Sequence, residues 1–359
     1  MEEIMDKVKI IKADSLKPHP EDSKLGFGNI FSDYMFNMDY NPDKGWHNPR
    51  IEPYGSFVLD PATMMLHYAQ GVFEGLKAYK TASGDIQLFR PEKNIKRFNR
   101  SCERMSIPQI DENFFLDAIK QLVAIEKDWV PSAHETSLYI RPTVIATDPF
   151  IGVRASHTYR FFIILSPVGA YYPEGFDPIK IWVTKKYVRA VRGGVGEAKT
   201  AGNYAASIYV SELAHKEGYT QVMWLDGVEL KYVEEVGSMN IFFVIDNEIV
   251  TPSLNGSILP GVTRDSVISL AKHWNMKVSE KLISIDEVVQ AHKDGKLMEI
   301  FGSGTAAVIS PVGQIKYDEK EYVINDFKVG SLTQKFYNAI TDIQYGKADD
   351  EHGWIVNVC

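Results

Sequence analysis

Residues 193–204, which read GGVGEAKTAGNY, include the most unusual combination of residue types in the chain. One lysine, Lys199, stands among glycines and small residues and directly ahead of an apolar stretch. Glycines allow a backbone to come close to a bound molecule. The segment is therefore the first candidate for a functional site.

One interpretation of this segment is a phosphate loop of a nucleotidase. Residues 193–200 miss the pattern GxxxxGK(S/T) by one position, and residues 221–226 imitate an apolar strand that ends in a metal-binding aspartate. However, Ala198 stands where a glycine is needed, and a run of mixed charge over 185–192 separates the loop from the preceding strand. The phosphate loop therefore stays a remote alternative, beside a surface loop in a catalytically inert binding protein.

Residues 202–204, which read GNY, strengthen a third interpretation. Together with the lysine they resemble the cofactor-lysine motif of the branched-chain amino acid aminotransferases, which belong to fold type IV of the pyridoxal-phosphate enzymes. Further stretches resemble the family in the same order, namely HY at 67–68, FEGLKA at 73–78, LFRP at 88–91, LYIRP at 138–142, EVGSMN at 235–240, LPGV at 259–262 and FGSGTA at 301–306. The similarity extends from about residue 27 to about residue 356.

The resemblance implies a cofactor, pyridoxal 5′-phosphate, held as a Schiff base by Lys199. The freed lysine amine would then carry the proton between the substrate Cα and the cofactor. Glu235 is implied as the partner of the ring nitrogen, since a carboxylate favours the protonated ring, and Tyr204 as the donor to the ring hydroxyl. We interpret the neighbouring Glu234 as a surface residue in a turn.

The phosphate group has one candidate site that follows from the sequence alone. Pro260 and Gly261 break the chain before a helix, and the N–H groups at a helix start bind anions, so Val262 and Thr263 are candidate ligands. The resemblance adds Arg97 and Thr305.

A pocket for leucine, isoleucine and valine must also admit the distal carboxylate of 2-oxoglutarate. The resemblance assigns an apolar pocket with one cation, Arg141, and places the substrate's own carboxylate on the backbone of Thr305 and Ala306. The side chains assigned to the pocket are Tyr68, Phe73, Tyr139, Tyr171 and Ser238. Ile151 and Val153 match a loop that reaches the neighbouring subunit's active site in the family, which implies a homodimer.

The implied reaction is the reversible transamination of branched-chain L-amino acids with 2-oxoglutarate. Two other fold type IV activities, D-amino-acid transaminase and aminodeoxychorismate lyase, stay open as alternatives. They generally have shorter chains without this long amino-terminal region.

The elements that must position these residues follow from periodicity. The sequence predicts amphipathic or apolar helices over 111–130, 203–217, 263–275 and 329–345, and strands over 56–59, 85–89, 137–141, 159–165, 180–184, 221–225 and 240–245. This pattern indicates a mixed α+β or α/β fold. The resemblance places the cofactor at a domain interface.

Length and composition set the remaining expectations. A chain of 359 residues exceeds the usual size of one core, and a turn-rich connection over 167–178 separates an expected small α+β domain, 1–166, from a cofactor-binding domain, 179–359. The net charge of −8 argues against a nucleic-acid partner. Two cysteines, no transmembrane stretch and no signal sequence predict a cytoplasmic protein without a metal site or membrane attachment.

Overall fold

The computed structural model describes residues 7–172 and 175–359, and the contacts within it divide the chain into two compact units. Unit 1 holds the chain up to Tyr171 together with Ala198–Ala201 and Ile343–Cys359, and unit 2 holds Tyr172–Glu197 and Gly202–Asp342. By its contacts, the short segment around Lys199 therefore belongs to unit 1. The domain bounds expected from the sequence stay predictions.

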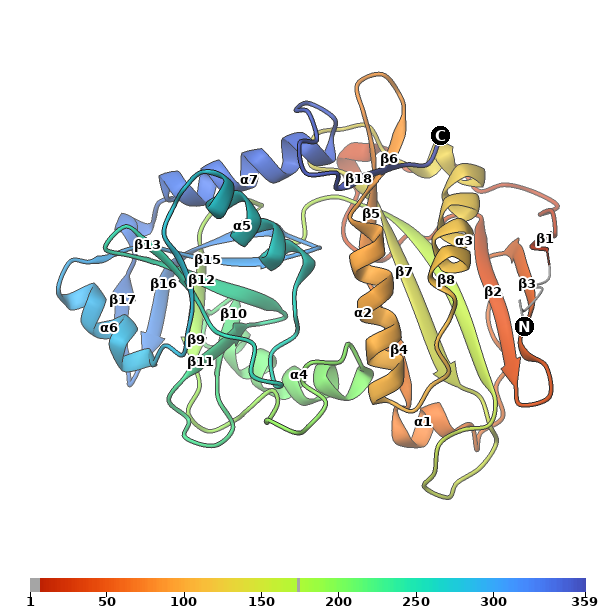
Figure 1. Ribbon diagram of the computed structural model, residues 1–359, viewed down its shortest axis with the longest axis horizontal. Helices are drawn as coiled ribbons and strands as arrows, with labels where there is room; N and C mark the ends of the chain where they lie inside the picture. The colour runs from red at the N-terminus through yellow and green to blue at the C-terminus, as the bar shows by residue number, and fades with distance from the viewer. Residues whose placement is uncertain (1–6, 173–174) are drawn as a thin grey trace. The chain divides into compact units, whose positions relative to one another are not determined.

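Unit 1 is built on a sheet whose strands are ordered β1, β3, β2, β8, β7, β5, β6 and β18, with β4 also paired to β7 (Figure 1). Neighbouring strands are antiparallel except β1 and β3. The strands are β1 (Lys9–Ile10), β2 (Tyr34–Asn41), β3 (Gly45–Pro53), β4 (Gly71–Phe73), β5 (Leu76–Lys80), β6 (Ile86–Phe89), β7 (Ser137–Ala146), β8 (Tyr159–Val168) and β18 (Ile355–Asn357).

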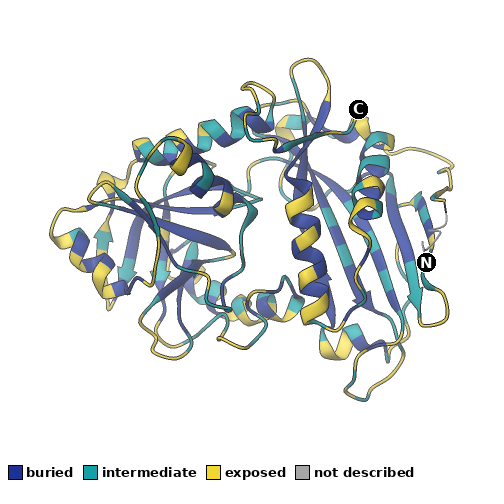
Figure 2. Ribbon diagram, in the orientation of Figure 1, coloured by how far each residue is buried: buried dark blue, intermediate teal, exposed yellow. Residues whose placement is uncertain are grey.

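Helices α2 (Pro91–Arg104) and α3 (Glu112–Ile125) cover one face of this sheet (Figure 1). Their apolar side chains form a core with alternate residues of the strands, including Leu76, Ile140 and Leu165. Figure 2 shows the inner sides of both helices as buried, and it shows buried positions along β7 and β8. Unit 1 also has α1 (Met64–Tyr68) and the 3-10 turns η1 (Asp22–Lys24) and η2 (Lys127–Trp129).

Unit 2 is built on a sheet that mixes parallel and antiparallel neighbours, ordered β11, β10, β9, β16, β15, β12, β13 and β14. Strand β17 pairs with β16, and β11 also pairs with β12. The strands are β9 (Ile179–Val183), β10 (Gln221–Leu225), β11 (Val233–Val236), β12 (Met239–Ile245), β13 (Glu248–Thr251), β14 (Val278–Glu280), β15 (Leu297–Gly304), β16 (Val308–Tyr317) and β17 (Lys320–Val323).

The helices of unit 2 confirm most of the periodicity seen in the sequence. They are α4 (Ala201–Lys216), α5 (Val262–His273), α6 (Ile285–Lys293) and α7 (Ser331–Gln344), with the 3-10 turn η3 (Asn325–Phe327). Helix α4 buries Val210 and Ala214 against Val222 and Trp224 of β10. The mixed α and β fold predicted from the sequence is thus confirmed.

One predicted strand, over 56–59, is wrong. Residues 54–60 form no strand, and Val58 is 97% exposed. A short apolar run forms a strand only where a neighbouring strand supplies hydrogen bonds. Here the chain instead turns at Asp60, whose carboxylate accepts the backbone N–H of Ala62 (2.7 Å).

No helix in the described parts of the chain has both the length and the hydrophobicity that a membrane crossing requires.

Candidate active site

Lys199 is fixed by its backbone to two elements of unit 1. Its N–H donates to Oγ of Ser101 (2.9 Å), and its carbonyl accepts the N–H of Phe73 (3.0 Å). The hydroxyl of Thr200 donates to the carbonyl of Gly71 (2.7 Å), which adds a second tie to β4. Nζ of Lys199 lies 5.1 Å from the centre of the Phe73 ring. The lysine is therefore held at a defined place beside β4.

Helix α2 presents a buried polar stripe to this lysine. Asn94, Arg97 and Ser101 follow each other at helical spacing and are each at most 5% exposed. By contrast, Lys93, Lys96 and Arg100 of the same basic run are exposed. Arg97 is thus distinguished from its solvated neighbours, although its proposed phosphate contact stays a prediction.

Glu74 is the centre of this stripe and received no role from the sequence. Its carboxylate binds Arg97 through two hydrogen bonds, Nε to Oε1 (2.7 Å) and Nη2 to Oε2 (2.9 Å), and it accepts Nδ2 of Asn94 (3.0 Å). Burial alone would raise the pKa of Glu74, but the charges of Arg97 and Lys199 and the hydrogen bonds outweigh it and hold that pKa below its usual value. A buried anion therefore lies within the electrostatic range of Lys199.

Three residues assigned to the substrate pocket lie together on unit 1. The guanidinium of Arg141 lies 4.9 Å from the centre of the Phe73 ring and 5.2 Å from that of Tyr139. Nη2 of Arg141 also donates to the hydroxyl of Tyr139 (3.1 Å). Phe27, which had no predicted role, packs edge-on against both Tyr139 and Tyr171. Two aromatic rings, those of Phe73 and Tyr139, thus lie against a cation on the same unit as Lys199.

Tyr68 lies at the end of α1 and is 38% exposed. Its hydroxyl donates to the carbonyl of Ile151, in the loop between β7 and β8. The side chains of Ile151 and Val153 are 69% and 86% exposed. The structure thus links Tyr68 to the loop expected at a subunit interface, and leaves two apolar side chains of that loop exposed in the single chain.

Glu235, on β11 of unit 2, lies in a buried ion pair. Its Oε2 is 2.6 Å from Nε of Arg189, and both side chains are at most 8% exposed. Oε1 accepts Nδ2 of Asn240 (3.3 Å). Arg189 also donates from Nη2 to the carbonyls of Gly196 (3.3 Å) and Ser257. Arg189 and Asn240 were both missed by the sequence reasoning.

Asn240 connects Glu235 to the start of α5. Its Nδ2 also donates to the carbonyl of Leu259 (2.9 Å), and a Cβ on Gly261 would lie 2.0 Å from its Oδ1. A side chain at this position would force the Asn240 amide to move. Gly261 is the residue before the helix and provides no side-chain cap, while Thr263 in the first turn is buried. The predicted anion site at Val262 and Thr263 thus lies in the same unit as the Glu235 carboxylate.

Strand register places a further polar residue beside Glu235. Glu235 pairs with Asn240, and Asn240 pairs with Ser303 on β15, so the three side chains share one face of the sheet. The hydroxyl of Ser303 is buried without a hydrogen-bond partner in the described structure. Thr305 and Ala306 follow in the turn between β15 and β16. A buried hydroxyl without a partner indicates a polar ligand at this row.

The remaining predicted residues of unit 2 have defined places. Ser238 lies in the turn between β11 and β12, and Tyr204 lies in the first turns of α4, where its carbonyl accepts Oγ of Ser207 (2.7 Å). The cofactor and substrate contacts assigned to them stay predictions.

One interpretation from the sequence is wrong, and the aspartate behind the remote phosphate-loop alternative has a structural role. Glu234 is not a surface residue but is 2% exposed, and its carboxylate accepts the hydroxyl of Ser257. Asp226, which imitated a metal-binding aspartate, accepts four backbone N–H groups of the following turn, from Val228, Glu229, Lys231 and Tyr232. Those hydrogen bonds lower the pKa of Asp226 to about 2, although burial opposes them. Its carboxylate shapes the turn.

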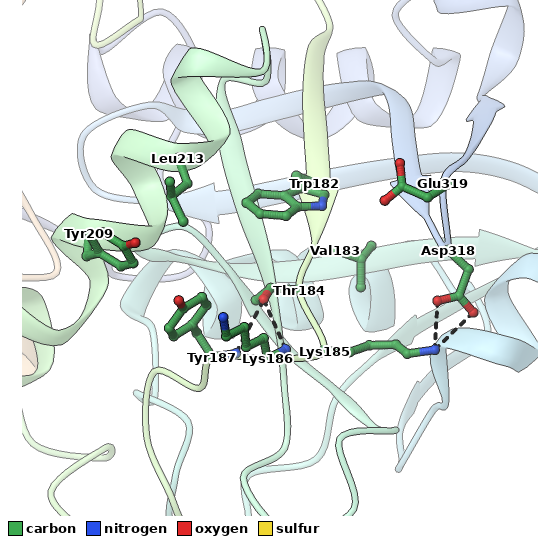
Figure 3. A pocket seen from close by; sticks show the side chains of 10 residues that line it. All are labelled: Trp182, Val183, Thr184, Lys185, Lys186, Tyr187, Tyr209, Leu213, Asp318 and Glu319. Atoms are coloured by element: carbon green, nitrogen blue, oxygen red, sulfur yellow. Dashed lines mark hydrogen bonds and ion pairs between the residues drawn. The ribbon is translucent and has the colours of Figure 1, made fainter.

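A separate hollow of about 500 Å³ lies on unit 2 between β9, α4 and the turn that joins β16 to β17 (Figure 3). Two of its charged lining residues form an ion pair, since Nζ of Lys185 lies 2.7 Å from the Asp318 carboxylate. Thr184, Tyr187 and Tyr209 also line it. None of the residues predicted for the site lines this hollow, so it is not the candidate active site.

Comparison with known proteins identifies close relatives. The family described as Amino-transferase class IV matches residues 71–315. The chain is 59% identical to branched-chain-amino-acid aminotransferase 2 of Bacillus subtilis, over 95% of this chain and 94% of that protein. Among solved structures it resembles the branched-chain amino acid aminotransferase of Escherichia coli, with a TM-score of 0.76 and 26% identity over 91% of this chain and 99% of that one. It also resembles the branched-chain aminotransferase of the archaeon Thermoproteus uzoniensis with norvaline, with a TM-score of 0.75 and 26% identity over 91% and 100%.

Proposed function

The chain belongs to the class IV aminotransferases, and within them to the branched-chain amino acid aminotransferases, and we propose that Lys199 is the residue that holds its cofactor. The enzyme uses pyridoxal 5′-phosphate and transfers the amino group of leucine, isoleucine or valine to 2-oxoglutarate.

On unit 1, Lys199 is proposed to move the reacting proton. Its backbone is hydrogen-bonded to Ser101 and Phe73, so the position from which its side chain extends is fixed. In that role Nζ takes the proton from the substrate Cα as general base and returns it as general acid. The buried carboxylate of Glu74 and the guanidinium of Arg97 form an ion pair, and their charges contribute to the electrostatic potential at this amine.

The polar groups of unit 2 fit a phosphorylated, ring-nitrogen-containing cofactor. When bound, pyridoxal phosphate supplies an electron sink for the charge that develops at the substrate Cα. Glu235 would hold the proton on the ring nitrogen, and the N–H groups at Val262 and Thr263 would bind the phosphate. Tyr204 would donate to the ring hydroxyl, and Thr305 is proposed as a further phosphate ligand. On unit 1, Arg97 is proposed as another phosphate ligand. The buried, unpartnered hydroxyl of Ser303 in the Glu235 row supports a polar ligand there.

The substrate side chain is proposed to lie against the aromatic residues of unit 1. Phe73 and Tyr139 offer apolar surface for a branched aliphatic chain, and Arg141 offers the cation for a distal carboxylate. We assign Tyr68, Tyr171 and Ser238 to the same pocket. The backbone of Thr305 and Ala306 is assigned to the substrate's own carboxylate.

The observation that carries this assignment is the doubly anchored Lys199 next to Phe73. Purified protein incubated with pyridoxal phosphate should be yellow, with an absorption band that Lys199→Ala abolishes. L-Leucine and 2-oxoglutarate should give glutamate, whereas D-alanine should be a poor donor. A protein that stays colourless, or that turns over D-alanine faster, would contradict the proposal.

We further propose that the protein is a homodimer and that it is located in the cytoplasm. The exposed side chains of Ile151 and Val153 support the dimer, since apolar residues of this kind are usually covered in an assembly. Val153→Asp should shift the mass measured by light scattering toward a single chain and reduce turnover together with it. The small number of cysteines supports the cytoplasmic location.

A further inference from the structure

The sheet of unit 1 has a second face, opposite to α2 and α3. Leu76, Ala78, Leu138, Ile140 and Leu165 point into the core under those helices. Because successive side chains of a strand alternate between the two faces, Lys77, Tyr139 and Ser166 point to the other face. Figure 1 shows α2 and α3 on one side of these strands.

Strand register places these three residues in one row. Lys77 on β5 pairs with Tyr139 on β7, and Tyr139 pairs with Ser166 on β8. Arg141, two residues along β7, points to the same face and donates to the Tyr139 hydroxyl (3.1 Å). The row therefore combines a lysine, a serine and the predicted substrate cation around one tyrosine.

The row lies close to the reacting amine. The ring of Phe73 lies 4.9 Å from the Arg141 guanidinium and 5.1 Å from Nζ of Lys199. The same aromatic ring thus lies against both cations. A dicarboxylate whose reacting carbon lies at Lys199 can place its distal group toward Arg141.

Two hydrogen-bond donors of this row lack an acceptor within the described residues. Nε of Arg141 and Oγ of Ser166 are both buried without a hydrogen-bond partner. Folded proteins almost always satisfy such groups, so two of them on one face indicate that a bound acceptor completes them. Lys77 is 7% exposed, and burial lowers its pKa to about 8, so its amine still carries charge at neutral pH. The missing acceptor is therefore expected to be an anion.

We propose that Lys77 and Ser166 extend the Arg141 subsite into a row that binds the distal carboxylate of 2-oxoglutarate and glutamate. This inference rests on the proposed function and names further residues for one of its two substrates. A branched aliphatic side chain gains nothing from the row beyond contact with the aromatic rings. Lys77 and Ser166 are thus specificity-determining residues for the acidic substrate.

The test compares two ligands that cannot react, glutarate and 4-methylpentanoate, on the cofactor-loaded enzyme. Lys77→Met keeps the length of the side chain and removes its charge. It should lower the glutarate to 4-methylpentanoate affinity ratio by about 30-fold. Ser166→Ala should lower the same ratio by about 5-fold. Lys77→Arg keeps the charge and should retain most of the selectivity.

Lys80→Met is the matched control, because Lys80 is on the same strand but on the face of Ala78. Its ratio should equal that of the wild type. If Lys77→Met does not fold, Lys77→Gln replaces it in the comparison. A ratio unchanged in both the Lys77 and Ser166 variants, or an equal loss of both ligands, would overturn the inference. A wild-type enzyme that does not transaminate leucine would instead overturn the proposed function.

Discussion

The carboxylate of Glu235 lies 2.6 Å from Nε of Arg189, and both side chains are buried. Arg189 also donates to the carbonyl of Gly196, in the glycine-rich segment that precedes Lys199. A Cβ on Gly196 would lie 2.2 Å from the carbonyl of Ser257, so this close approach needs a glycine. One arginine therefore holds both the carboxylate and the loop that leads to the lysine.

Replacing Glu235 by glutamine should reduce turnover strongly while the cofactor stays bound. The amide has nearly the same shape, but it lacks the negative charge that favours a protonated ring nitrogen. We expect kcat for leucine to fall by about 100-fold or more, as when other preorganised electrostatic groups are removed. Steady-state kinetics and the cofactor absorption band measure the two quantities separately. An undiminished rate would remove Glu235 from this role.

Replacing Arg189 by methionine should destabilise the fold as well as the site. The change leaves Glu235 as a buried charge without its ion-pair partner, which costs about 3 to 5 kcal/mol. Urea unfolding should therefore show a lower midpoint for Arg189→Met. In the double variant with Glu235→Gln, part of that loss should be recovered, because the uncompensated charge is gone. Equal losses in the single and double variants would argue against a coupled pair.

Local patterns predicted several elements of this protein, but not α6 or long strands such as β2, β3 and β16. The apolar spacing of Phe115, Ile119 and Leu122 predicted α3, and Pro260 with Gly261 predicted the start of α5. Such signals depend on neighbours three or four residues apart, so they can be seen in one sequence. The helix predicted to extend to residue 130 ends at Ile125, where a 3-10 turn takes over.

The contacts of the site could not be predicted in the same way. Ser101 and the N–H of Lys199 are 98 residues apart in the chain, and Glu74 is 23 residues from Arg97. These pairs form because β4, α2 and the Lys199 segment contact one another in the folded chain. The residues near each of them in the sequence do not indicate those contacts. Helical spacing of Asn94, Arg97 and Ser101 was visible, but without burial it could not be told from a solvated face.

The pH dependence of stability should reflect Glu126, which is 2% exposed. Burial raises its pKa from 4.5 to about 7, although it accepts the N–H of Tyr34. Between these values the folded protein holds a proton that the unfolded chain releases. The contribution of Glu126 to the free energy of unfolding is thus fully present below the pKa of the unfolded chain. It is lost as the pH rises through the pKa of the folded protein.

Glu126→Gln removes this dependence. We compare the free energy of unfolding of the variant with that of the wild type. As the pH rises from about 5 to about 8, this difference should shift in favour of the variant by on the order of 2 kcal/mol. Denaturant melts at both pH values measure it. Glu103→Gln, an exposed change on α2, is the control and should show no such trend. A constant difference between wild type and Glu126→Gln would disprove the assignment.

Ser101 should act as a positioning residue for Lys199. Its hydroxyl donates to the carbonyl of Arg97 (2.9 Å) and accepts the backbone N–H of Lys199 (2.9 Å), so it joins α2 to the lysine. Ser101→Ala removes the acceptor and should lower kcat by about 10-fold, since small displacements of a reacting group are costly. KM for leucine should change far less.

Ser269→Ala provides the matched control for this change. The hydroxyl of Ser269 donates to the carbonyl of Asp265 (2.8 Å), the same bond within a helix, but on the exposed side of α5. Both variants lose that bond, and only Ser101→Ala also loses the contact with Lys199. If the two variants have the same kcat, or if Ser101→Ala changes KM alone, Ser101 does not position the lysine.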